Sequence, residues 1–265
     1  MHLSYVVLDV TLVPDSFKAL KTLHLLSIRY KGNDNESFTR LLSKCLVLED
    51  LQIEYHDATQ TFTVEVPSLQ SLSIIRSPSQ CFCLNTPSLK HLRIEACIMR
   101  LCNIQKMPQI VTADINNLIQ TDLRDIPGSL TSVKHLSLCL IAPQGQIFNQ
   151  LHHLSFWTCY RDWPSYLKWI IEASPKLQTL KLYHHDHSTL PNMRLCDTRV
   201  NIPECSLPHL KTFEWRGYEE TLENRKLASY ILTNASGLKW ALISSELIIH
   251  ADKKKEWILK DLMRT

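Results

Sequence analysis

The chain has 265 residues, of which 45% are hydrophobic, and its formal net charge is +3. A chain of this length and composition can bury a sizeable core, and so weak a positive charge lacks the concentrated field that nucleic-acid binding usually requires. No apolar run approaches the ~18 residues of a membrane-spanning helix, and the N-terminus lacks the basic segment of a signal peptide. We therefore expect a protein that binds neither nucleic acid nor membrane.

Nine cysteines occur without a C-x-x-C pair. An odd number of cysteines cannot all pair within one chain, which favours reduced thiols and a cytoplasmic or nuclear location. Cys97 and Cys159 occupy the ninth position of the repeat described next, where a thiol facing the interior is typical. We predict neither a metal nor a cofactor.

One apolar pattern, L-x-x-L-x-L, recurs from end to end, with Leu89 to Ile94 as a clear copy. Its copies begin at Leu20, Leu48, Leu69, Leu89, Ile110, Val133, Leu151, Leu177, Leu210 and Leu238. This spacing is typical of a leucine-rich repeat. The pattern predicts an α/β solenoid of about ten irregular repeats around a curved parallel sheet.

Residues 5–13 are rich in β-branched residues and predict one strand. After the Leu20 repeat, Phe38, Leu41 and Leu42 recur at helical spacing, and Asn35 can cap that helix. The following arms, residues 61–66 and 81–84, are instead rich in strand-forming residues, so we expect strands on both faces of the solenoid in this part.

Helices return in the second half of the chain. Trp163 and Pro164 open one, whose apolar side would be formed by Trp163, Leu167, Ile170 and Ile171. Thr221 can cap another, with Leu227, Tyr230 and Ile231 facing inward. A last strand follows from Leu238 to Ser244.

Side chains alternate along a strand, so the residues between the repeat leucines point to the concave face of the sheet. That middle row is polar and mixed in charge, as expected of a surface that binds a protein or of an ordinary solvated face. It comprises His24, Gln52, Ser73, Arg93, Asp114, Ser137, Ser155, Lys181, Glu214 and Leu242.

Beside that row stand His91, His135 and His153, the last two on adjacent predicted strands. The spacing fixes no third ligand, so surface histidines are expected rather than a metal site. The composition of the run His184-His185-Asp186-His187 favours a loop between two repeats. Trp157 and Tyr183 end successive strands and are candidate interface anchors, unless a neighbouring loop covers them. The candidate partner-binding residues are His24, Gln52, His91, Arg93, Asp114, His135, His153, Trp157, Lys181 and Tyr183.

Two stretches are more specific than the repeat itself. Phe213-Glu214-Trp215-Arg216-Gly217-Tyr218, followed by a helix ending Tyr230 to Ala235, resembles the FBD region of the plant F-box/FBD/leucine-rich-repeat family. The stretches Leu20 to Leu25, Val47 to Leu51 and Asn85 to Lys90 are similar to the repeats of the same family. The resemblance places a solenoid at 1–195 and an FBD-like region, continuous with it, at 196–265.

The resemblance implies a non-catalytic scaffold that holds a protein substrate for a cullin-RING (SCF-type) ubiquitin ligase. Family members recruit a Skp-type adaptor through an F-box; because no F-box-like segment precedes the first repeat, that adaptor is a doubtful partner of this chain. One alternative is a truncated paralogue or fragment that binds a partner without a ligase. Another is a small-molecule-dependent receptor in which residues 184–209 fold over the strand ends. Enzyme signatures such as G-x-S-x-G and H-E-x-x-H are missing, so no catalysis is expected.

Overall fold

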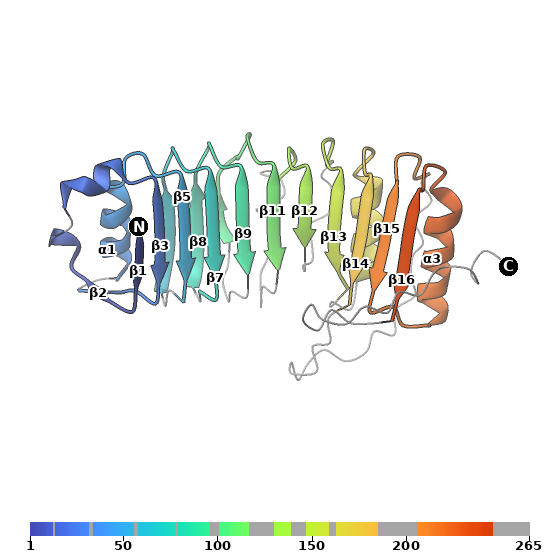
Figure 1. Ribbon diagram of the computed structural model, residues 1–265, viewed down its shortest axis with the longest axis horizontal. Coiled ribbons are helices and arrows are strands. Elements are labelled where there is room, and N and C mark those ends of the chain that lie inside the picture. The colour runs from blue at the N-terminus through green and yellow to red at the C-terminus, as the bar shows by residue number, and fades with distance from the viewer. Residues whose placement is uncertain are drawn as a thin grey trace. The chain divides into compact units, whose positions relative to one another are not determined.

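A computed structural model describes residues 1–12, 14–31, 34–55, 58–77, 79–95, 101–116, 130–138, 147–158, 163–184 and 206–245. By their internal contacts the residues divide into two compact units, Met1–Val133 (unit 1) and Lys134–Thr265 (unit 2). The predicted boundary between residues 195 and 196 lies outside the described residues. Each unit is built on parallel strands that carry the repeat pattern (Figure 1).

The main sheet of unit 1 has every strand parallel to its neighbour. Its strands, in spatial order, are β1 (His2–Ser4), β3 (Thr22–Leu26), β5 (Asp50–Glu54), β7 (Ser71–Ile75), β9 (His91–Glu95) and β11 (Thr112–Asn116). Parallel neighbours need a crossover segment, and each repeat supplies one.

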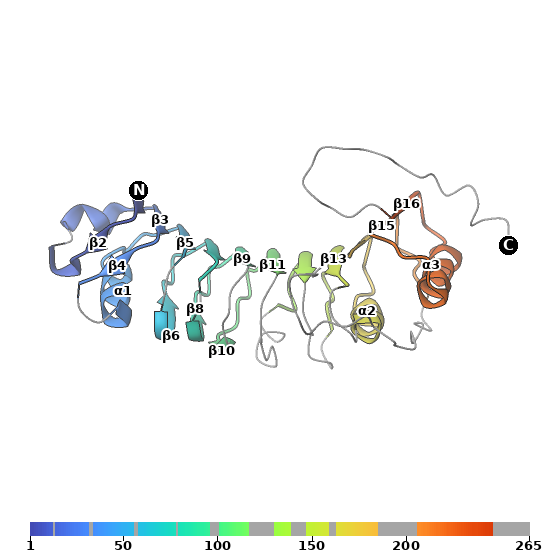
Figure 2. The ribbon, with the colours of Figure 1, turned by 90° about the horizontal axis from the view of Figure 1, so that it is seen from below.

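A second layer covers one side of these strands (Figure 2). Helix α1 (Asp34–Ser43) lies in this layer, as do the parallel strands β6 (Ala58–Glu65), β8 (Ser79–Asn85) and β10 (Leu101–Ile104). The prediction of strands on both faces is therefore confirmed, with β10 as an addition. Phe38, Leu41 and Leu42 of α1 are buried as predicted, and the Asn35 side chain lies outside what the structure describes.

The start of the chain differs from its prediction. Residues 5–13 do not form one strand: β2 (Val7–Leu8) pairs with β4 (Arg29–Tyr30), and 3-10 turns follow at Val10–Leu12 and Asp15–Ala19. Tyr5 breaks the extended backbone with a φ of 54°. The same left-handed conformation recurs after the next strands, at Ser27, Tyr55 and Arg76.

Unit 2 contains the parallel strands β12 (His135–Leu138), β13 (His153–Trp157), β14 (Thr179–Tyr183), β15 (Thr212–Arg216) and β16 (Trp240–Ser244). Helices α2 (Trp163–Glu172) and α3 (Leu222–Asn234) cover one side of these strands (Figure 2). Both helices form where they were predicted, and Leu227 and Ile231 of α3 are buried, but Tyr230 is only half-buried. Thr221 caps α3, its hydroxyl accepting a hydrogen bond of 3.1 Å from the Asn224 N–H.

The repeat leucines form the core between the layers, because alternation along each strand turns every second side chain inward. In β5, for example, Leu51 and Ile53 are fully buried and Gln52 between them is not. The predicted class, an α/β leucine-rich-repeat fold on a parallel sheet, is confirmed. The opposite side of each sheet, here called the open face, presents the residues between the leucines.

Candidate functional site

The middle row predicted from the sequence is a register row in the structure. Its members pair as Cα neighbours from strand to strand in both units. The row runs through His24, Gln52, Ser73, Arg93 and Asp114 in unit 1, and through Ser137, Ser155, Lys181, Glu214 and Leu242 in unit 2. The structure thus brings each candidate of this row to the open face of its own unit.

In unit 1 the polar groups of the open face are held by close neighbours. The Arg93 Nε donates to Glu95 Oε2 at 3.2 Å, two residues along the same strand. His91 Nδ1 lies 2.8 Å from Thr112 Oγ1 on the adjacent strand, and the Asn116 amide donates to Asp114. These groups form a solvated face of mixed charge without a common focus.

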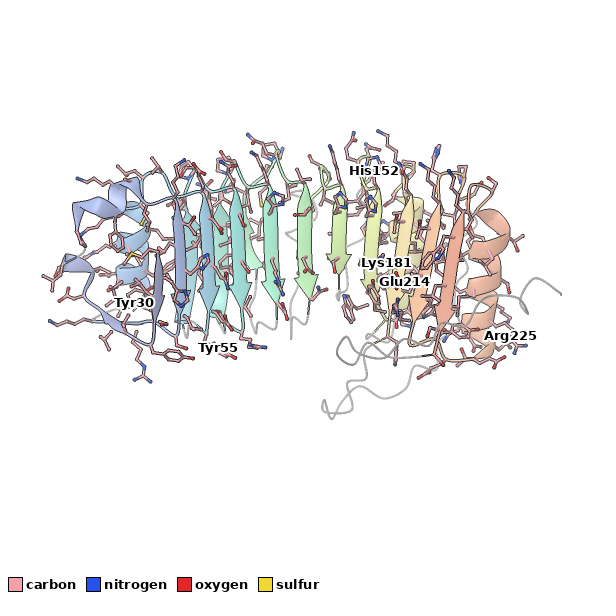
Figure 3. All side chains as sticks on the ribbon, viewed as in Figure 1. Tyr30, Tyr55, His152, Lys181, Glu214 and Arg225 are labelled. Carbon is pink, nitrogen blue, oxygen red and sulfur yellow. The ribbon has the colours of Figure 1, made fainter. Side chains whose placement is uncertain are left out.

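In unit 2 the charged groups of the open face gather around Glu214. The sequence placed this residue on an exposed row, but it is only 6% exposed. Lys181 Nζ lies 3.2 Å from Glu214 Oε2 (Figure 3). Arg216 pairs with the other carboxylate oxygen. Leu242, the next residue in the row, is also buried. A buried carboxylate is tolerated here because both of its oxygens have a cationic partner.

Two aromatic residues border this ion-pair cluster. Trp157 and Tyr183 are register neighbours, with ring centroids 5.0 Å apart and planes tilted by 40°. Both are half-buried, so neither is fully covered or fully exposed. Burial raises the pKa of the Tyr183 hydroxyl. Partial burial acts to lower the pKa of Lys181, but Tyr183 and Glu214 outweigh it and leave that pKa above its usual value.

We call Trp157, Lys181, Tyr183, Glu214 and Arg216 the charge-aromatic site. Sequence reasoning found three of its members but missed the roles of Glu214 and Arg216. The signal was available: Glu214 and Arg216 are two residues apart on one strand and therefore share a face, and Glu214 stands opposite Lys181. Aromatic and arginine side chains such as Trp157, Tyr183 and Arg216 are residue types enriched at protein interfaces.

The predicted histidine pair is also present. The rings of His135 and His153 stack with centroids 4.3 Å apart and planes 7° from parallel. Partial burial, followed by the nearby His135, His152 and Lys181, lowers the pKa of His153. Among the described residues no three His, Cys, Asp or Glu side chains are grouped so that they could hold a metal ion.

Other sequence predictions lie partly or wholly outside the described residues. These are the thiols Cys97 and Cys159, the run His185 to His187, and the segment 185–205 of the proposed lid. Within the described part, Cys45 and Cys83 are free thiols. Each helix in the described ranges is too short or too polar to span a lipid bilayer.

Comparison with known proteins agrees with the fold. The FBD family model matches residues 199–243, and the Leucine Rich Repeat model matches residues 19–46. The chain therefore contains one segment that is similar to the FBD family and one that is similar to leucine-rich repeats.

Among its relatives is an F-box/FBD/LRR-repeat protein of Arabidopsis thaliana that is 39% identical over 93% of this chain and 60% of the relative. Two putative FBD-associated F-box proteins of the same plant are 35% and 37% identical, over 98% and 97% of this chain and 60% and 63% of their own lengths. The resemblance to the plant F-box/FBD/LRR-repeat family is therefore confirmed for the repeats and the FBD region. The chain spans about 60% of the length of these curated relatives. No solved structure matches it.

Proposed function

We propose that this chain is a non-catalytic scaffold that recognises a protein substrate for a cullin-RING (SCF-type) ubiquitin ligase in the cytoplasm or nucleus. The observation that supports it most directly is the charge-aromatic site on the open face of unit 2. A partner covering this face would bury two aromatic rings and pair with Lys181 and Arg216, whose side chains are both 38% exposed. Aromatic and arginine side chains supply most of the energy at protein interfaces.

The printed names of the relatives supply the ligase context. They are F-box proteins, and they share with this chain both its repeats and its FBD region. We extend that context to this chain as a proposal. The remaining candidates of the open face, His24, Gln52, His91, Arg93 and Asp114 in unit 1 and His135 and His153 in unit 2, are proposed as peripheral contacts.

The test compares variants of the full chain expressed in plant cells, with co-purified proteins quantified for each. Trp157→Ala removes the larger ring of the site, and Lys181→Met keeps the aliphatic stem but removes the charge. Tyr55→Ala is the matched control, because Tyr55 is an exposed aromatic residue in unit 1 (Figure 3). We expect one set of proteins to be lost by about tenfold or more in Trp157→Ala and Lys181→Met and kept in Tyr55→Ala.

Degradation supplies the second half of the test. A protein lost from the site variants should accumulate when the gene for this chain is silenced, and blocking the proteasome should abolish that difference. A direct pull-down with a Skp-type adaptor then examines recruitment. If the intact chain captures its partner but not the adaptor, the ligase role does not belong to this chain, and a competitor of its longer relatives is the better description.

A further inference from the structure

A second surface of unit 2 lies at the edge where its strands begin. The residue immediately before each strand except β16 accepts, through its carbonyl oxygen, a backbone hydrogen bond of 2.8–2.9 Å from the equivalent residue of the next strand. In spatial order the residues joined in this way are Lys134, His152, Gln178, Lys211 and Lys239. Strand spacing places their side chains ~4.8 Å apart in a row of ~19 Å. Figure 3 shows His152 at this end of the strands, away from Lys181 and Glu214.

This row is strongly basic, and the first outward residues of the strands add to it. His135 and His153 stack on the open face directly beside the row. We call Lys134, His135, His152, His153, Lys211 and Lys239 the basic edge. Lys134, His135, His153, Lys211 and Lys239 are exposed, and His152 is half-exposed.

The equivalent row of unit 1 contains an acidic residue as well as lysines, so the repeat alone does not explain the positive charge of the row in unit 2. There Lys21 Nζ pairs with Glu49 Oε1 at 2.8 Å, and Lys90 donates to Gln70 at 2.9 Å. In unit 2, the acidic side chains of the described residues lie elsewhere: Glu172 pairs with Lys168 on α2, Glu214 is in the middle row, and Glu219, Glu220 and Glu223 follow the far end of β15. Lys211 bonds to a neutral residue, Gln178, at 3.1 Å.

We propose that the basic edge of unit 2 binds an extended acidic polypeptide segment. An extended chain rises about 3.3 Å per residue, so about six residues would cross the row from Lys134 to Lys239. Trp240 is 47% exposed, lies at the Lys239 end and offers an apolar contact to a side chain of that segment. The proposal rests on the proposed function only in requiring that the chain bind polypeptides, and it adds the chemistry of the partner.

His153 should make binding at this surface dependent on pH. Partial burial lowers the pKa of His153 most, and the positive charges that face it, from His135 on β12, His152 beside it in the chain and Lys181 on β14, lower that pKa further. An acidic ligand would oppose these charges and favour the imidazolium. Binding should therefore strengthen as the pH falls from ~7.5 to ~5.5.

The test measures fluorescence anisotropy of a labelled peptide of about eight residues, alternating Glu and Ser and ending in Phe, against the full chain. A peptide with Gln in place of Glu is the matched probe. We expect the acidic peptide to bind at least about tenfold more tightly, and its affinity to fall between ~50 and ~200 mM salt. A preference for the Gln peptide, or none, overturns the proposal.

Matched variants locate the site. Lys134→Glu and Lys239→Glu each reverse an exposed charge on the edge, and Lys226→Glu makes the same change on an exposed position of α3. The edge variants should weaken binding at least about fivefold and the control less than about twofold. His153→Asn should reduce the rise in affinity at low pH. Equal losses in all three charge variants would mean that no local site exists.

Two further probes separate this partner from other polyanions. A single-stranded oligonucleotide and phosphatidylserine vesicles should bind more weakly than the peptide; tighter binding of either, lost in the edge variants, contradicts the proposal. Trp157→Ala should leave peptide affinity unchanged. If Trp157→Ala loses the cellular partners while the edge variants keep full peptide binding, the proposed function stands and the basic edge fails.

Discussion

The indole of Trp163 packs edge-on against the indole of Trp215, with ring centroids 5.9 Å apart and planes at 82°. Trp163 opens α2 and Trp215 lies in β15, so the contact joins one repeat to the FBD region that follows. Trp215 is 1% exposed and also meets Tyr218 at 5.0 Å. The sequence pattern did not indicate Trp163 as a neighbour of Trp215.

Trp215→Ala should lower the free energy of unfolding by ~3–5 kcal/mol, because it opens a large cavity in a closed aromatic cluster. Trp163→Ala should cost less, and the double variant should lose ~0.5–1.5 kcal/mol less than the two single losses together, since each single change already removes their shared contact. Urea denaturation followed by circular dichroism gives these values. Trp240→Ala, which truncates a Trp that is 47% exposed, is the control and should stay within about 0.5 kcal/mol.

The same experiment examines continuity between the repeats (1–195) and the FBD-like region (196–265), which we propose as one stack. The parallel pairing of β14 with β15 supports it. A single transition that shifts as a whole in Trp215→Ala agrees with this proposal, and a separate transition for the FBD-like region contradicts it. Loss of partner capture at an unchanged midpoint would make this region a recognition surface.

The period-two alternation was enough to predict which strand residues face the core. Leu23 and Leu25 are buried around His24, and the same alternation holds through β14. It fails in β15 and β16, where Glu214 and Leu242 of the outward row are also buried. It could not show that Glu214 is buried, because that depends on a pair of cations reaching it from β14 and from its own strand. Nor could it find the contact between Trp163 and Trp215, because periodicity tells which way a side chain points and not which helix it meets.

Leu92→Asp tests the inward assignment directly. Leu92 is 4% exposed and lies in register with Leu72 and Ala113. An unpaired carboxylate there should cost several kcal/mol or shift its pKa upward, and the loss should spread because each repeat packs on its neighbours. Arg93→Gln, on the exposed side of the same strand, removes only the surface pair with Glu95 and should change stability by less than about 1 kcal/mol. Equal shifts in melting temperature would contradict the assignment.

The left-handed residues that follow strands of unit 1 allow a substitution that should raise, and not lower, the free energy of unfolding. Ser27 has a φ of 50°, and its N–H donates to the Glu54 carbonyl at 2.9 Å, so the strained conformation is fixed by the neighbouring repeat. Ser27→Gly should stabilise the fold by up to about 1 kcal/mol, because glycine adopts this conformation without steric cost. Ser27→Val should destabilise it by ~1–3 kcal/mol. Thermal melts that rank Val above Gly would show that the turn is not constrained.

Gly237 is required for a different reason: two backbone carbonyl oxygens lie so close to it that a side chain would not fit. A Cβ at this position would lie 2.7 Å from the Pro208 oxygen and 3.4 Å from the Leu210 oxygen. The turn at Pro208 would have to move away from the turn that follows α3, so Gly237→Ala should cost ~1–3 kcal/mol. Ser236→Ala, on the exposed neighbour, is the matched control and should be nearly neutral. Chemical denaturation of both variants decides the point.

The stability of the free chain should depend on pH through His153. Its pKa in the folded chain lies below the ordinary value of 6.5, because burial and the nearby His135, His152 and Lys181 disfavour the imidazolium. The unfolded chain therefore binds this proton more readily, so the contribution of His153 is fully present above pH ~6.5 and is lost as the pH falls toward the folded-state pKa. His153→Asn should flatten this decline in unfolding free energy between pH ~7.5 and ~5.5. NMR titration of the His153 ring offers the direct check: a midpoint at or above the ordinary value would contradict the lowering of the His153 pKa by burial and nearby positive charge.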